Sequence, residues 1–200
     1  VRKGYLWVVV GINTRMIYLL YDDGSRSEKV ILNELGGCKG IIQSDGYSPY
    51  RKLESDAYPH ITRIPCLQHI KRKFIDCGED EPDAKRIVEL INTLYQNEHK
   101  HKIGVDGWTV EQNLVHRKKY APDILGEIKD VLDDIEERGD LLPKSELKEA
   151  ITYLRNEWNA VVDIFNYGDT YLDNNIVERM NRYISLSRKN SLFFGSHKGA

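Results

Sequence analysis

The first third of the chain alternates short apolar stretches with turn residues. β-Branched and aromatic residues predict strands over residues 5–11 and 16–22, joined as a hairpin by the turn at 12–15. The same reasoning, together with helical spacing of apolar residues, predicts two more strands (40–46, 61–66), two short helices (27–37, 67–77) and a brief helix after Pro49. This part of the chain therefore has a mixed α/β pattern.

From residue 83 onward the apolar positions recur at the spacing of long amphipathic helices. Helices are predicted over 83–100, 110–139 and 143–165, with a break at Pro122 in the second and Pro143 in the first turn of the third. The pattern predicts an all-helical block of roughly 80 residues after the α/β part.

The stretch YLDNNIVERMNRYISLSRKN, residues 171–190, predicts a further helix, capped by Asp173 or Asn174. Residues three and four apart share a face, so this helix has one apolar and one polar face. The apolar face carries Ile176, Val177, Met180 and Ile184, and the polar face carries Asn174, Glu178, Asn181, Arg182 and Ser185. Glu178 thus lies amid polar side chains near the positive end of the helix.

Composition describes an ordinary globular chain, with 40% hydrophobic and 30% charged residues and a net charge of -2. Residues 123–149 contain ten acidic and four basic residues, whereas residues 179–198 contain five basic and no acidic ones. A polyanion partner therefore fits local patches despite the net charge. No apolar run is long enough to span a bilayer, so no membrane partner is expected, and three cysteines fit a reducing cytoplasm better than a disulfide framework.

Two carboxylates distant in the sequence are the first candidates for chemistry. Asp45 follows a predicted buried strand, where α/β proteins place ligands, and Glu178 lies on the last helix. Carboxylates that converge from such positions suit Mg²⁺, and paired ions of this kind catalyse phosphoryl transfer. The residue types equally allow Asp45 to begin a turn and Glu178 to pair with Arg182.

Other motifs give weaker signals. Cys66, His69 and Cys77 resemble a metal-ligand spacing, but a structural zinc site needs four ligands, and a buried cysteine beside a basic helix start accounts for the same residues. A basic segment followed by aromatic residues lies near the end of the sequence, with Arg188 and Lys189 before Phe193 and Phe194. Such a segment suits binding to nucleic acid, with the aromatic rings stacked on bases. It equally suits a strand or cap that packs on the core. No phosphate loop or nucleophilic-serine signature is present in the sequence.

Several segments in the same order resemble the catalytic region of the insertion-sequence 66 family of bacterial DDE transposases. They cover nearly the whole chain: GYLWVVV, SDGYSPYRKL, CLQHIKRKFIDC, PKSELKEAITYLRNEWNAV and LDNNIVERMNRYISLSRKNSLFFGS. The last segment is the most specific, because a DNN-x-x-ER followed by RKN and Phe-Gly-Ser is not a generic helix.

The resemblance implies an α/β fold with a ribonuclease-H-like mixed sheet and a large all-helical insertion before the final acidic helix. Three parts are expected: residues 1–80 as the α/β part, 81–168 as the helical insertion, and 169–200 as the catalytic helix and basic tail. Three carboxylates would bind two Mg²⁺ or Mn²⁺ ions for DNA strand cleavage and strand transfer. Asp45 maps to the second carboxylate and Glu178 to the third.

The resemblance also implies a partner and a place of action. DNA is the expected partner, as transposon ends and target, with a homo-oligomer in the active complex and a cytoplasmic, nucleoid-associated location. The expected DNA contacts, which supply salt-sensitive affinity, are His69, Arg72, Arg179, Arg182, Arg188 and Lys189.

The family's first catalytic Asp lies in a motif resembling D-E-T-P, on a strand that precedes GYLWVVV. The chain begins after that point, and Asp22 and Asp23 lie in the wrong place to substitute for it. We therefore expect the first, central strand of the sheet to be absent and the chain to be a transposase fragment or remnant that is inactive alone. The alternatives are a metal-dependent nuclease that does not join strands, and a non-catalytic DNA-binding or assembly module.

Overall fold

The computed structural model describes residues 4–190, except the side chains of residues 184 and 187–190. Contacts group the chain into two units. The strand unit comprises the described parts of 1–41, 47–62 and 174–200, and the helical unit comprises 42–46 and 63–173. The units are described separately below.

The strand unit contains the predicted hairpin. Strands β1 (Trp7–Gly11) and β2 (Met16–Leu20) pair antiparallel, with Trp7 opposite Leu20 and Gly11 opposite Met16. The Trp7 ring lies 6.2 Å from Tyr47 and 6.5 Å from Tyr50, which belongs to the short 3₁₀ helix η1 (Ser48–Glu54). This aromatic cluster joins the hairpin to the segment that follows β3.

Two α-helices complete this unit. Helix α1 (Glu28–Leu35) begins at Ser27, whose hydroxyl accepts the Lys29 amide, and it contacts η1. Helix α6 (Asn175–Asn190) contacts β1. Ile176, Val177 and Met180 are half-buried, in agreement with the predicted apolar face. The helices predicted in this unit are therefore confirmed.

Strands β3 (Gly40–Ser44) and β4 (Ile61–Pro65) form a second sheet. The Gly40 amide donates to the His60 carbonyl, and the Cys66 amide donates to the Ser44 carbonyl. Because the partner positions advance together along both strands, the pair is parallel. The chain passes between the two units within this sheet.

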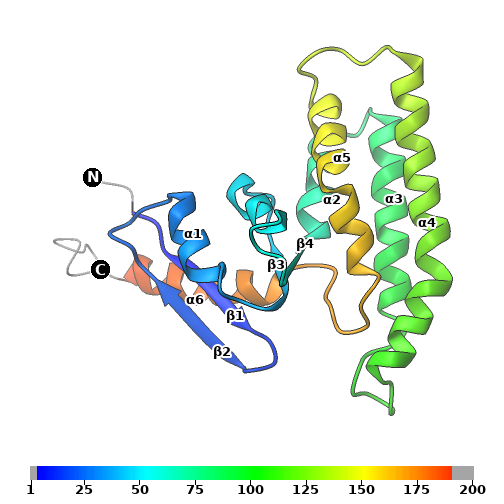
Figure 1. The fold of residues 1–200 in the computed structure, drawn as a ribbon. Coiled ribbons are helices and arrows are strands. Elements are labelled where there is room, and N and C mark those ends of the chain that lie inside the picture. Colours follow the sequence, from blue (N-terminus) through cyan, green and yellow to red (C-terminus); the bar gives the residue numbers. More distant parts are fainter. Residues whose placement is uncertain (1–3, 191–200) are drawn as a thin grey trace. The chain divides into compact units, whose positions relative to one another are not determined.

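The helical unit is a bundle (Figure 1) of α2 (Leu67–Ile75), α3 (Pro82–Glu98), α4 (Val110–Arg138) and α5 (Glu146–Ile164). Its core is a continuous cluster of aliphatic side chains from all four helices, with Phe74 and Phe165. Helix α4 starts with a capping box, in which Thr109 and Gln112 satisfy each other's backbone amides, and it ends at Gly139 with φ 67°. The predicted helical block is confirmed.

Two predicted details of these helices are wrong. Helix α4 runs through Pro122 without a break, because Ala121, Ile124 and Leu125 around it are buried in the core and hold the helix in place. Helix α5 begins after Ser145 rather than at Pro143, since the Ser145 hydroxyl accepts the Lys148 amide and fixes the cap there.

The overall class is mixed α/β with long helices, as predicted, and the strands within residues 4–190 form two two-stranded sheets. The boundaries expected after residues 80 and 168 stay predictions. Within residues 4–190, no helix has the length and apolar character required to cross a bilayer.

Candidate functional site

Asp45 directly follows β3 and is half-buried. Its backbone carbonyl accepts the Ser44 hydroxyl at 3.0 Å and is 3.4 Å from Nη2 of Arg63. The strand end and two polar side chains therefore fix the backbone from which this carboxylate projects.

A buried ion pair lies behind Asp45. Arg63 donates from Nη1 and Nη2 to Oε2 of Glu157 at 2.7 and 2.6 Å, and from Nε to the Ser44 hydroxyl at 3.0 Å. The exposed fractions of the two charged side chains are 0% and 1%, so neither charge is solvated by bulk water. Charge-assisted bonds of this kind are strong and geometrically specific. They tie the end of β3 to helix α5.

Gly46 allows a second close contact with α5. A Cβ at this position would lie 1.6 Å from the Tyr153 hydroxyl oxygen, so only glycine fits. Burial, and then the nearby charge of Glu157, raises the pKa of Tyr153 to about 12. The phenol thus stays protonated at neutral pH next to the segment that carries Asp45.

Glu178 lies in the first turn of α6 and is exposed. Asn174 occupies the N-cap position, and its carbonyl accepts the amides of Val177 and Glu178 at 2.9 and 3.2 Å. A carboxylate at this end of a helix is favoured by the helix dipole. Glu178 belongs to the strand unit and Asp45 to the helical unit, so their convergence stays a prediction.

The predicted DNA contacts are distributed over both units. His69 is half-buried and Arg72 exposed on α2, whereas Arg179 and Arg182 are exposed on α6. The side chains of Arg188 and Lys189, as well as Phe193 and Phe194, lie outside the described residues. Their roles stay predictions.

The zinc alternative gains no geometric support. Among residues 4–190, no three His, Cys, Asp or Glu side chains lie close enough together to hold a metal ion. Cys66 is buried in the core, and the Cys77 thiol donates to the Lys73 carbonyl. The buried position of Cys66 agrees with the alternative of a buried cysteine next to a basic helix start, and a metal role of these residues stays a prediction.

Arg117 is the centre of a polar network that sequence reasoning missed. Its side chain is fully buried on α4, although it carries a charge. It donates to Glu98 and to acceptors at the end of α5 and in the segment after it: the carbonyls of Ile164, Tyr167 and Thr170 and the Thr170 hydroxyl. The Arg117 guanidinium thus fixes the connection that leads into α6.

Glu98 balances the Arg117 charge. Burial raises the pKa of Glu98, but the bond to Arg117, its charge, and bonds from Tyr120 and Asn113 outweigh burial and lower it overall. Further along the connection, the Tyr171 carbonyl accepts the side-chain amide of Gln43 at 2.8 Å. The Leu172 carbonyl accepts the backbone amide of Leu67, also at 2.8 Å. The stretch before the DNN motif is therefore anchored along its length within the helical unit.

The family model "Transposase IS66 family" matches residues 1–200. The chain belongs to the IS66 transposase family. This membership confirms the resemblance carried by the SDGY and DNN-x-x-ER segments.

Three relatives of this IS66-family chain come from Sinorhizobium fredii (strain NBRC 101917 / NGR234), and each is described as an uncharacterized protein. The protein y4jD is 30% identical over 88% of the chain and 34% of its own length. The proteins y4qI and y4hP are 28% and 27% identical over 98% and 91% of the chain, and over 38% and 35% of their own lengths. The chain thus spans little more than a third of these relatives. No solved structure matches it.

Proposed function

We propose that the chain is the catalytic region of a DDE transposase, with Asp45 and Glu178 as two of its metal-binding carboxylates and DNA as its substrate. The observation that carries this proposal is the support of Asp45. Its backbone is held at the end of β3 by Ser44 and the buried Arg63–Glu157 pair. A buried ion pair brings little net stability, so its position directly behind a proposed ligand favours a role in orienting Asp45.

The donor set fits a hard divalent cation. Carboxylate oxygens are the ligands that Mg²⁺ and Mn²⁺ prefer, and such an ion activates the attacking oxygen and stabilises the leaving one in phosphoryl transfer. Asp45 would bind from a fixed strand end. Glu178 would bind from the first turn of α6, where neighbouring Arg179 and Arg182 are exposed and suited to phosphate contacts.

A ribonuclease-H-like sheet is part of the proposal. In the part of the chain that the structure describes, β1 pairs with β2 alone and β3 with β4 alone. A strand placed between β1 and β3 would satisfy one open edge of each and merge the two pairs into a single mixed sheet. In the family fold this strand carries the first catalytic Asp, so the first of the three carboxylates would come from outside these 200 residues.

Strand transfer tests the proposal. A version of the chain extended by the strand with the D-E-T-P-like motif should join the 3′ end of a labelled transposon-end DNA to plasmid when Mg²⁺ is present. Asp45→Asn and Glu178→Gln should each abolish joining, while Asp56→Asn, a substitution of an exposed residue in the strand unit, should not.

Three outcomes contradict the proposal in different ways. Cutting without joining would favour the nuclease alternative. Strand transfer by the 200-residue chain alone would refute the need for an added carboxylate. Joining that survives both carboxylate substitutions would exclude Asp45 and Glu178 from the reaction and leave them structural.

A further inference from the structure

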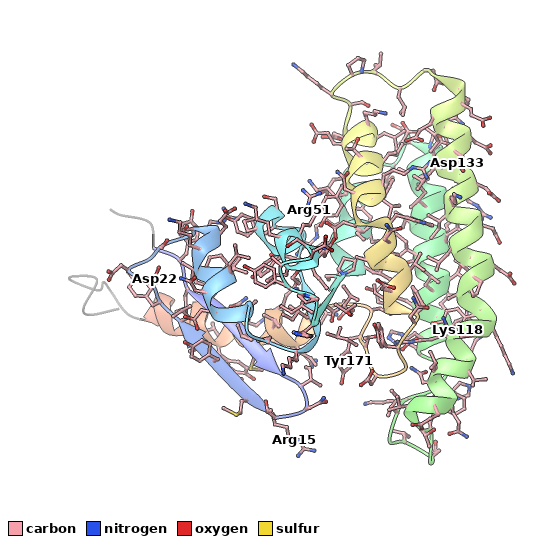
Figure 2. The ribbon with its side chains drawn as sticks, viewed as in Figure 1. Arg15, Asp22, Arg51, Lys118, Asp133 and Tyr171 are labelled. Carbon is pink, nitrogen blue, oxygen red and sulfur yellow. The ribbon has the colours of Figure 1, made fainter. Side chains whose placement is uncertain are left out.

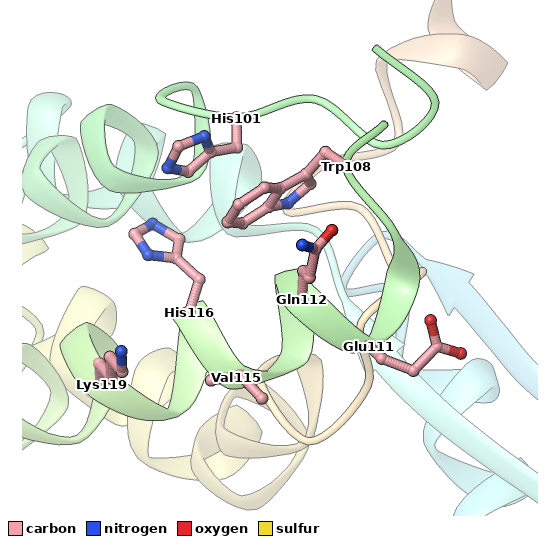
Figure 3. Close-up of a pocket in the computed structure, with 7 residues that line it drawn as sticks. All are labelled: His101, Trp108, Glu111, Gln112, Val115, His116 and Lys119. Carbon is pink, nitrogen blue, oxygen red and sulfur yellow. The ribbon is translucent and has the colours of Figure 1, made fainter. Parts of the chain in front are cut away.

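A surface hollow of about 490 Å³ lies beside the start of α4, in the helical unit and in a region that the proposed reaction does not use (Figure 3). It lies between the α3–α4 connection and the first three turns of α4. Its lining residues are His101, Trp108, Glu111, Gln112, Val115, His116 and Lys119. Three of these seven side chains are flat rings.

The rings are ordered against one another. The His101 ring stacks on Trp108 with centroids 3.8 Å apart and an interplanar angle of 13°. His116 meets His101 and Trp108 edge-on, at 5.2 and 6.1 Å. Val115, which is 57% exposed, adds an apolar surface on the next turn of the helix. His101 and Val115 are exposed, and Trp108 and His116 are partly buried. The apolar surface that they leave in water favours a flat apolar ligand.

Hydrogen bonds fix the position of Trp108, one of the rings that line the hollow. The Trp108 indole N–H donates to Oδ1 of Asn113 at 3.3 Å, and the Asn113 amide donates to the Gly168 carbonyl at 2.8 Å. A Cβ on Gly168 would lie 2.1 Å from the Val110 carbonyl oxygen, so this contact requires glycine. Because Trp108 is fixed before any ligand arrives, binding would cost little side-chain ordering.

Charge around the hollow indicates the chemistry of the ligand. Four exposed lysines lie on the α3–α4 connection and the first turns of α4: Lys100, Lys102, Lys118 and Lys119. Glu111 and Asp106 are the exposed acidic residues in the same stretch, 99–119. The acidic residues of α4 gather in its second half, around Asp133, and Figure 2 shows Lys118 and Asp133 far apart along the helix. A ligand with both a flat ring and negative charge fits the lysine-rich end.

We infer that this hollow binds an unpaired nucleobase of DNA, with the base against the Trp108, His101 and His116 rings and the adjoining phosphates near Lys119 and Lys102. The inference rests on the proposed function for its partner, DNA, and adds a contact with single-stranded or extruded nucleotides. Base stacking on aromatic side chains tolerates every base, and a base in a duplex must leave its stack to reach such a hollow.

Three DNA probes test the inference with the 200-residue chain in a fluorescence-anisotropy titration at fixed salt: a single-stranded oligonucleotide, the same oligonucleotide with abasic sites, and a duplex. The wild-type chain should bind the intact strand on the order of 5- to 100-fold more tightly than the abasic one. Trp108→Ala should remove most of that preference and leave duplex affinity unchanged.

Two substitutions at exposed positions test the hollow independently, in case Trp108→Ala impairs folding. Val115→Glu places a carboxylate in the hollow at an exposed position and should abolish the preference for intact over abasic DNA. Glu111→Gln removes an opposing charge from the lining of the hollow and should strengthen binding of both single-stranded probes. Lys129→Ala, an exposed position on the acidic half of α4, is the control and should change the binding of none of the three probes.

The test distinguishes failure of the inference from failure of the proposed function. Equal binding of intact and abasic strands by the wild-type chain, or an unaltered preference in Val115→Glu, would overturn the inference while duplex binding still supported the proposed function. Absence of binding to all three probes would overturn the inference together with the DNA-binding part of the proposed function.

Discussion

Replacement of Arg63 by Met tests the buried support of Asp45. The change removes two bonds to Oε2 of Glu157, one to the Ser44 hydroxyl and the 3.4 Å contact with the Asp45 carbonyl. It also takes the Arg63 charge away from a Glu157 carboxylate that is 1% exposed. Breaking a buried ion pair by removing one partner costs about 3–5 kcal/mol. We expect the free energy of unfolding of the helical unit to fall by that amount.

The double variant Arg63→Met with Glu157→Leu separates an unpaired charge from lost packing. Replacing both members of a buried pair with apolar residues is often neutral or stabilising, so the double variant should recover most of the loss. Guanidinium unfolding followed by far-UV circular dichroism measures both variants against the wild-type chain. A loss below about 1 kcal/mol in the single variant, or no recovery in the double, would refute the burial argument.

Three more predictions concern the same unit. Gly46→Ala should destabilise the helical unit by about 1–3 kcal/mol through the clash with Tyr153. In a chemical unfolding series, adding Tyr153→Ala to Gly46→Ala should partly restore the free energy of unfolding. Additive losses from the two substitutions would contradict the clash. The lowered pKa of Glu98 means that its contribution to stability is complete above the ordinary pKa and is lost as pH falls through the folded one. The stability difference between wild type and Glu98→Gln should therefore shrink on acidification below about pH 4, and a constant difference would contradict the Arg117 pairing. Pro122→Ala should raise the melting temperature, because it restores a helix hydrogen bond inside α4; an unchanged or lower value would show that the surrounding core depends on proline.

Apolar spacing was sufficient to predict most of the secondary structure. The β1–β2 hairpin, the later strands, the short helix α2 and the three long helices α3 to α5 follow from residue patterns that act locally. The predicted break at Pro122 is wrong because the local rule for proline ignores tertiary packing, and the core around Ala121 and Ile124 outweighs the lost bond. Local rules therefore work where no distant contact opposes them.

The polar network behind the site could not be predicted in the same way. Arg63 and Glu157 are 94 residues apart, and Arg117 and Thr170 are 53 apart, so nothing in their own neighbourhoods marks them as buried partners. In the sequence Arg117 lies within a basic run, and this pattern in a helix predicts a solvated side chain. Only the folded chain shows that these charges are enclosed.

The sequence contains a signal for the aromatic hollow. The stretch HKHKIGVDGW, residues 99–108, combines histidine, lysine and tryptophan in a way typical of a nucleic-acid contact, and His116 follows one helix segment later. The stacking of His101 on Trp108 required the structure.

The metal affinity of Asp45 and Glu178 variants tests the central claim most directly. Isothermal titration of Mn²⁺ into the 200-residue chain should show binding that Asp45→Asn and Glu178→Gln each weaken by roughly tenfold or more, since each removes a charged ligand. Asp56→Asn should bind as the wild type does. Unchanged Mn²⁺ affinity in both carboxylate variants would contradict the claim that these two residues share a metal site.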